Sequence, residues 1–237
     1  MNCDPQSLME AAKCYRCLPH SRLREAQVYL LCQWANNLTP PVVPFYFALD
    51  QALDLWIDTN GTHNAGNYTL AQFQAIADYP SVTRLTFITA TNLTSISGLQ
   101  NFPLLSRFDC GKLRSPILDF SGLFNLQIIS TTTAFVHSEL TSLTLNGCSA
   151  LYQLWITSQS LASVDISDCP LLTNINLQSN LLTQTAVDNI LHQLVLHGQT
   201  GGGVTLDGLT NAAPSAAGLA DKAILEALVP PWTVTTN

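Results

Sequence analysis

Residues 140–180 read LTSLTLNGC (140–148), LYQLWITSQ (151–159), LASVDISDC (161–169) and LTNINLQSN (172–180), joined by one or two residues. Each segment is L-x-x-L-x-L-x-x-C/N with small variations, and the two cysteine-ended segments are 21 residues apart. This offset predicts that Leu140 and Leu161 occupy equivalent sites in successive coils of a solenoid. Solenoids usually present a surface to a partner, so the pattern favours binding over catalysis.

The pattern extends in both directions with less regular spacing. We call the recurring apolar residues of each expected coil its anchor. The expected anchors before residue 151 are Val82-x-x-Leu85-x-Phe87, Leu105-x-x-Phe108-x-Cys110, Leu123-x-x-Leu126-x-Ile128 and Leu140-x-x-Leu143-x-Leu145. Within 140–180 the pattern also repeats about every half-coil, which predicts strands on both faces of the coil. Together these features predict an α/β fold built as an irregular parallel β-solenoid.

The last third of the chain changes character. Longer intervals separate the last two strand patterns, Val204-x-Leu206 and Trp232-x-Val234, each from the strand pattern before it. These intervals contain helical patterns at 185–196 and 214–228. The second helix is expected to bury Leu219, Ala223, Leu225 and Leu228. These two βα coils are predicted to cap the solenoid, because a bare end exposes apolar side chains and strand edges.

Three regions are predicted. Residues 1–38 form a helical module that contains four cysteines, with helices at 5–17 and 21–34. Residues 39–78 form a loop-rich connector with short helices at 45–56 and 70–78. Residues 79–237 form the solenoid.

The charge distribution narrows the choice of partner. Residues 1–114 hold eight basic and eight acidic residues, whereas beyond Arg114 one cation, Lys222, faces eight carboxylates and accounts for the net charge of −7. A surface with so few cations does not neutralise a phosphate backbone, so nucleic acid is not an expected partner. No apolar run reaches the 18–20 residues of a membrane span and no signal segment opens the chain, so we expect synthesis in the cytosol without membrane insertion.

The N-terminal cysteines leave three alternatives open. Cys14-x-x-Cys17 has metal-ligand spacing, and with Cys3 and Cys32 it supplies the four thiolates of a zinc site. The second alternative is a set of disulfides among the same residues, and the third is free thiols packed between helices. Apart from the possible zinc ion, no cofactor is expected. Cys148 and Cys169 recur at one position of successive coils, where we expect side chains to bond the turning backbone rather than each other.

Other candidate motifs lack the required context. The glycine-rich segment 198–203 leaves a predicted helix and enters a strand, the reverse of a phosphate-binding loop, and therefore predicts a turn. The segment that begins at Asp58 lacks the ligand spacing of a calcium loop. Asp165 and Asp168 are the carboxylates that a glycan-cleaving enzyme would use, but they are expected to be solvated turn residues. The sequence therefore predicts no active site.

Two aromatic residues are the candidate contact residues. Tyr152 and Trp155 occupy variable positions of the 151–159 segment, so both side chains should point away from the core. An outward tryptophan on a strand is a suitable anchor for a protein or sugar partner. Packing against the outer side chains of neighbouring coils is the alternative.

The segments LTSLTLNGC and LASVDISDC resemble the leucine-rich-repeat superfamily, which implies a curved solenoid with a binding or scaffolding role. The two ends of the chain resemble tailed-bacteriophage virion proteins that carry leucine-rich repeats. The segments that carry this resemblance are MNCDPQSLMEAAKCYRCLP and TNAAPSAAGLADKAILEAL. The resemblance implies a non-enzymatic virion subunit (decoration, tail or fibre-associated) that contacts other virion proteins, or a protein or glycan of the host surface. A homo-oligomer is compatible with it. The alternative is a cytoplasmic repeat adaptor that binds one protein.

Overall fold

The computed structural model describes residues 46–49, 54–59, 62–66, 82–88, 93–111, 115–131 and 139–237, all of which belong to the second of two compact units, Pro44–Asn237. The predicted helical module, its four cysteines and the predicted helix at 70–78 lie outside the described residues. No described helix combines the length and apolar character that crossing a bilayer requires.

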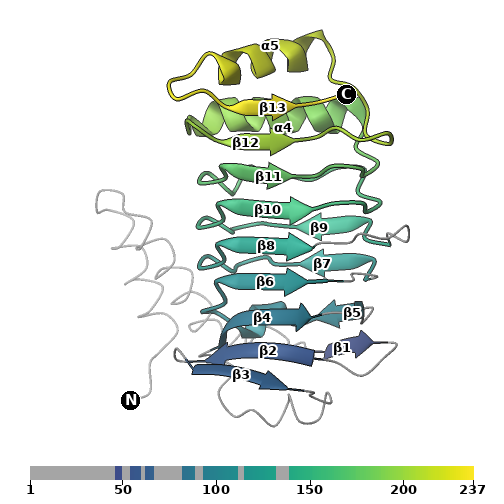
Figure 1. Ribbon diagram of the computed structural model, residues 1–237, viewed down its shortest axis with the longest axis vertical. Helices are drawn as coiled ribbons and strands as arrows, with labels where there is room; N and C mark the ends of the chain where they lie inside the picture. The colour runs from purple at the N-terminus through teal and green to yellow at the C-terminus, as the bar shows by residue number, and fades with distance from the viewer. Residues whose placement is uncertain are drawn as a thin grey trace, which may run out of the picture. The chain divides into compact units, whose positions relative to one another are not determined.

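The main element is a nine-stranded sheet in the order β13-β12-β11-β10-β8-β6-β4-β2-β3. Seven of its strands run parallel: β4 (Val82–Ile88), β6 (Arg107–Cys110), β8 (Ile128–Thr131), β10 (Gln153–Ile156), β11 (Asn174–Asn176), β12 (Gly203–Thr205) and β13 (Thr233–Thr235). In Figure 1 these strands are stacked in chain order, as expected for a solenoid-like fold.

A second layer of strands forms the return half of the coils. β7 (Ile117–Asp119) pairs in parallel with β9 (Ser142–Thr144), and Figure 1 shows both arrows pointing opposite to β6, β8 and β10. This arrangement confirms the predicted return strand for segment 140–148, whereas segment 161–169, where the same pattern predicts another one, forms no strand. It also corrects the anchors, because Leu143 pairs with Leu118 in this layer, whereas the neighbour of β8 in the main sheet is β10. Both half-coils bury alternate aliphatic residues, so the pattern alone does not tell them apart.

The register of β8 is the second correction. Ile129 pairs with Phe108 of β6, so the equivalent of Leu105-x-x-Phe108 is Leu126-x-x-Ile129, three residues after the predicted anchor. Leu123 is buried in the turn before the strand, where its carbonyl accepts a hydrogen bond from the Leu126 N–H. The predicted anchor therefore combined a turn residue with the strand.

The connector region also differs from its prediction. Residues predicted as a helix at 45–56 contribute strands β1 (Tyr46–Leu49) and part of β2 (Asp54–Thr59), and β3 (Thr62–Gly66) follows. β2 pairs antiparallel with both β3 and β4, and β1 pairs antiparallel with β5 (Leu93–Ser97), which precedes the short 3-10 helix η2 (Leu99–Asn101). Strand pairing satisfies the backbone groups of these segments and overrides a short apolar pattern.

The core lies between the two strand layers. Leu143, Val164 and Ile175, from different coils, all belong to one buried cluster, as the repeat predicts. Phe108 is fully buried, and its ring lies 5.7 Å from Phe87 and 5.1 Å from Phe120, measured between ring centroids.

Buried amide side chains connect successive coils at the corner that follows the strands. The Leu140 N–H donates to Gln159, the Leu161 N–H to Asn180 and the Leu182 N–H to Asn211. Asn180 Nδ2 in turn donates to Ile156 O at 2.8 Å and to Leu177 O at 2.9 Å. These amides provide the polar partners that the turning backbone needs inside the protein.

Two helices accompany the last strands. α4 (Gln184–His197) begins at the capping Thr183, whose hydroxyl accepts from the Ala186 N–H, and ends at Gly198 with φ 67°. α5 (Ala216–Glu226) begins at Ser215. The two helices and the strands β12 and β13 occupy the positions that the sequence predicts.

The orientation of α5 differs from the prediction. Leu225 is buried and Leu228 packs against the core, as predicted, but α5 also buries Gly218, whereas Leu219 is 52% exposed and Ala223 is exposed. The reason is a close approach to α4: a Cβ at Gly218 would collide with Asp188, whose carboxylate accepts from the Ser215 N–H. The helix is apolar on several sides, so its periodicity does not identify the buried one.

The glycine-rich segment is the turn between α4 and β12, as predicted. A Cβ on Gly202 would lie 2.6 Å from the Trp232 ring and 2.7 Å from Thr173 O, whereas one on Gly203 would meet nothing within 4 Å. We expect Gly202→Ala to lower the free energy of unfolding by about 1–3 kcal/mol, because Trp232 is held in place by a bond from its Nε1 to Gln199 O.

The matched control is Gly203→Ala, for which we expect a change within about 0.5 kcal/mol. Urea denaturation of the two variants measures the difference. Equal stabilities would show that Trp232 does not pack on Gly202.

Candidate functional site

The outward side of the nine-stranded sheet is the candidate site. Along the parallel strands from β6 to β13 buried residues alternate with partly or fully exposed ones, because successive side chains point to opposite faces, whereas in β4 the outward Thr86 is itself buried. We call the outward positions the polar face: Arg84, Thr86, Arg107, Asp109, Ile128, Ser130, Gln153, Trp155, Asn174, Asn176, Gly203, Thr205, Thr233 and Thr235. Most are polar and uncharged, which suits a surface that contacts a partner from solvent.

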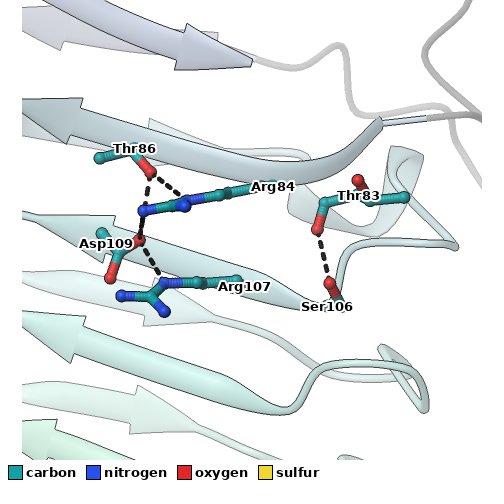
Figure 2. Close-up of polar contacts among 6 residues, drawn as sticks. All are labelled: Thr83, Arg84, Thr86, Ser106, Arg107 and Asp109. Carbon is teal, nitrogen blue, oxygen red and sulfur yellow. Dashed lines mark hydrogen bonds and ion pairs between the residues drawn. The ribbon is translucent and has the colours of Figure 1, made fainter. Parts of the chain in front are cut away.

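A cluster of charged side chains occupies the β4–β6 end of this face (Figure 2). Arg84 and Arg107 contact the same carboxylate oxygen, Asp109 Oδ2, at 3.2 and 2.7 Å. The Thr86 hydroxyl donates to this oxygen at 3.1 Å and accepts from Arg84 Nε at 2.9 Å. The hydrogen bond to Asp109 raises the pKa of Arg107, so its guanidinium remains charged. The cluster thus holds two cations around one half-buried anion.

Backbone and side-chain bonds fix the two strands that carry the cluster. Next to Arg107, Ser106 donates from both its N–H and its hydroxyl to Thr83 O, at 2.8 and 2.9 Å (Figure 2). Thr83 is the neighbour of Arg84, so the two arginines are held in register.

The predicted contact residues lie further along the same face. Trp155, on β10, is 36% exposed, and its Nε1 donates to Asn174 Oδ1 of β11 at 2.8 Å. Tyr152 immediately precedes β10 and is 39% exposed. Both side chains point away from the core, as the sequence predicts, and the bond to Asn174 fixes the indole on the surface. Because polar face positions alternate with core positions, Trp155 and the arginine cluster share one surface.

The two acidic residues considered for catalysis belong to turns. Asp165 accepts from the Ser167 N–H, and Asp168 accepts from the Gly147 N–H of the preceding segment, each at 2.9 Å. Each carboxylate therefore stabilises backbone in a turn, as the sequence predicts. Within the described part of the chain, no group of three or more His, Cys, Asp or Glu residues has the geometry to hold a metal ion.

Cys148 and Cys169 bond to backbone rather than to each other. Cys148 Sγ donates to Phe120 O at 3.2 Å, and Cys169 Sγ lies 3.9 Å from Leu145 O. Both are buried, and neither forms a disulfide. Each thiol connects its segment to the preceding coil, which confirms the predicted role. Cys110 is buried in the core, as predicted.

Burial should make these thiols unreactive. Burial raises the pKa of Cys148 to about 12 and raises that of Cys169 further, so almost no thiolate exists at pH 8. We expect iodoacetamide at pH 8 to leave both cysteines unmodified in the folded protein and to alkylate both in urea. Peptide mass spectrometry measures the difference, and rapid alkylation of either thiol in the folded protein would contradict this burial.

The Arg84–Arg107–Asp109 cluster is the part of the site that the sequence analysis missed. Its signal is an Arg-x-Thr in β4 and an Arg-x-Asp in β6, spaced by one coil. The repeat pattern tracks buried aliphatic residues, so it gives no weight to the positions between them.

Comparisons with known proteins give little guidance. No family model matches the chain, and neither does any curated protein. Among solved structures, the chain is similar to the functional domain of InlJ from Listeria monocytogenes, which includes a cysteine ladder, with 20% sequence identity and a TM-score of 0.31. The similarity covers 54% of this chain and 31% of that one, so the chain spans about a third of that domain's length.

Proposed function

We propose that the chain is a non-enzymatic binding protein of the leucine-rich-repeat type, and that the polar face of its nine-stranded sheet contacts a protein partner. The observation that carries the proposal is Trp155, a large aromatic side chain that is exposed to solvent and held by Asn174. Aromatic residues fixed in this way commonly dominate the binding energy of interfaces, because they bury much area at small entropic cost.

The supporting observations concern the rest of the face. Its residues are supplied by strands of successive coils in register, so it is continuous across β4, β6, β8, β10 and β11. The two Asp residues that a glycan-cleaving enzyme would use bond to turn backbone instead. A rigid surface with a central aromatic residue and a charged cluster at one end suits recognition.

Trp155→Ala tests this proposal. We expect the variant to lose capture of the partner from the protein's source material while its melting temperature changes little, because the indole is partly exposed and makes one side-chain hydrogen bond. Quantitative pull-down and thermal denaturation measure the two effects. Undiminished capture would overturn the role of Trp155, and a large fall in melting temperature would identify it as a packing residue.

We further propose that the protein works as a virion component, with the N-terminal region attached to the particle. The support is the resemblance of both ends of the chain to phage virion proteins. Mass spectrometry of purified particles tests this location: the chain should be present at a fixed copy number. Its absence from particles, together with one stoichiometric partner in cell lysate, would instead favour a cytoplasmic adaptor.

A further inference from the structure

Arg107 is the more exposed of the two arginines on the polar face, since Arg84 exposes only 29% of its side chain. It shares Asp109 Oδ2 with Arg84, and only its Nε bonds to that oxygen. Among the described residues its two terminal guanidinium nitrogens have no hydrogen-bond partner, and the side chain is 39% exposed (Figure 2). Arg107 therefore retains donors that face solvent.

The charges of the described cluster do not cancel. Two arginines share the single carboxylate of Asp109, so the cluster carries one positive charge in excess. On the other side of Arg107 the register places Ile128, and the polar face from β8 to β13 carries no charged residue. The excess positive charge is thus most accessible to a partner at Arg107, in a chain whose net charge is −7.

Exposed apolar side chains lie in three of the turns that precede strands of the polar face. Leu104, Phe124 and Leu171 lie in corresponding turns just before β6, β8 and β11, and are 48%, 41% and 45% exposed. We call these three residues the apolar ridge. Exposed leucine side chains suit apolar protein groups, whereas sugar hydroxyls placed against leucine would lose water without gaining a hydrogen bond. The ridge therefore favours a polypeptide over an acidic glycan.

We propose that the partner held on the polar face is a polypeptide segment that carries an acidic residue on Arg107 and apolar residues on the ridge and on Trp155. This inference rests on the proposed function and adds the chemistry of the partner. A carboxylate matches the planar guanidinium donors of Arg107, and the uncharged neighbouring strands present no like charge to repel it.

The test is selection of random twelve-residue peptides displayed on a carrier, with the immobilised full-length protein as the target. Selected peptides are synthesised, and their dissociation constants are measured for the wild type and three variants. Arg107→Gln removes the proposed contact, and Trp155→Ala tests the face itself. Lys222→Gln is the matched control, because it removes one positive charge on α5, where Lys222 bonds to Thr236 just after β13, five strands away from the β6 strand of Arg107 in the sheet order. Melting temperatures establish that each variant is folded.

We expect selected peptides to be enriched in Asp or Glu beside apolar residues, and to bind Arg107→Gln roughly tenfold more weakly, with Lys222→Gln unchanged. Peptides that require Trp155 but lack acidic residues, or that bind Arg107→Gln as tightly as the wild type, would overturn this inference alone. Failure to select any peptide that requires Trp155 would overturn both the inference and the proposed function. Tighter binding of an acidic polysaccharide than of any selected peptide would also overturn the polypeptide assignment.

Discussion

Replacing Asn180 with leucine should destabilise the protein by about 2–6 kcal/mol. The Asn180 side chain is fully buried, accepts from the Leu161 N–H and donates to Ile156 O and Leu177 O. Leucine would leave the Leu161 N–H and the Ile156 carbonyl without this partner, and an unsatisfied buried backbone group costs roughly 1–3 kcal/mol. Leu177 O keeps a bond from Asn211, so it adds little to the loss.

Equilibrium denaturation in urea measures this effect, with Asn125→Leu as the matched control. Asn125 is exposed and makes a hydrogen bond from Nδ2 to Pro103 O, so its replacement should cost no more than about 1 kcal/mol. If the two substitutions had equal effects, the buried amide would not connect the coils as the structure indicates.

Phe108→Ala should destabilise the protein by about 3–5 kcal/mol, the range measured for buried aromatic residues replaced by alanine. Phe108 is fully buried between the rings of Phe87 and Phe120, in the layer between the two sets of strands. Removal of the ring leaves a cavity, and because the neighbouring residues belong to hydrogen-bonded strands, the cavity cannot close fully.

The comparison for this prediction is Phe124→Ala, on the ridge, where the ring is 41% exposed. We expect a loss of about 1 kcal/mol or less for Phe124→Ala, measured in the same urea titration. A loss for Phe108→Ala as small as that for Phe124→Ala would show that Phe108 is not buried between Phe87 and Phe120 in solution.

Much of the stacked architecture can be predicted from the sequence, because the buried aliphatic residues repeat. Leu143, Val164 and Ile175 share one core, and α4, α5, β12 and β13 lie where the pattern predicts. The assignment of each half-coil was less accurate. Leu140–Leu145 belongs to the β7–β9 layer, and residues 54–59 form a strand because β4 offers an edge to pair with. Such pairings depend on residues distant in sequence, which a local pattern does not contain.

Tyr152 and Trp155 were identified because they occupy variable positions of the repeat, which point outward; that they contact a partner stays a prediction. The carboxylate that Asp109 shares between two arginines was not identified. Its contacts join two coils through outward side chains, and the outward residues change from coil to coil. The amides Gln159 and Asn180 were also missed, although they are 21 residues apart, as are Cys148 and Cys169. Backbone bonding was predicted at the position of the two cysteines, whereas amides also perform it, at the other corner of the coil.

The most direct test of the proposed binding face is photo-cross-linking from Ser130, which lies between Asp109 and Trp155 in the register of the sheet. A photoreactive amino acid at Ser130 should cross-link one partner in the source material, and adding Trp155→Ala should abolish the product. The same group at Leu209, fully exposed in the turn after β12, should yield no such product. Identical products from both positions, or a product from Leu209 alone, would contradict the assignment of the polar face as the binding surface.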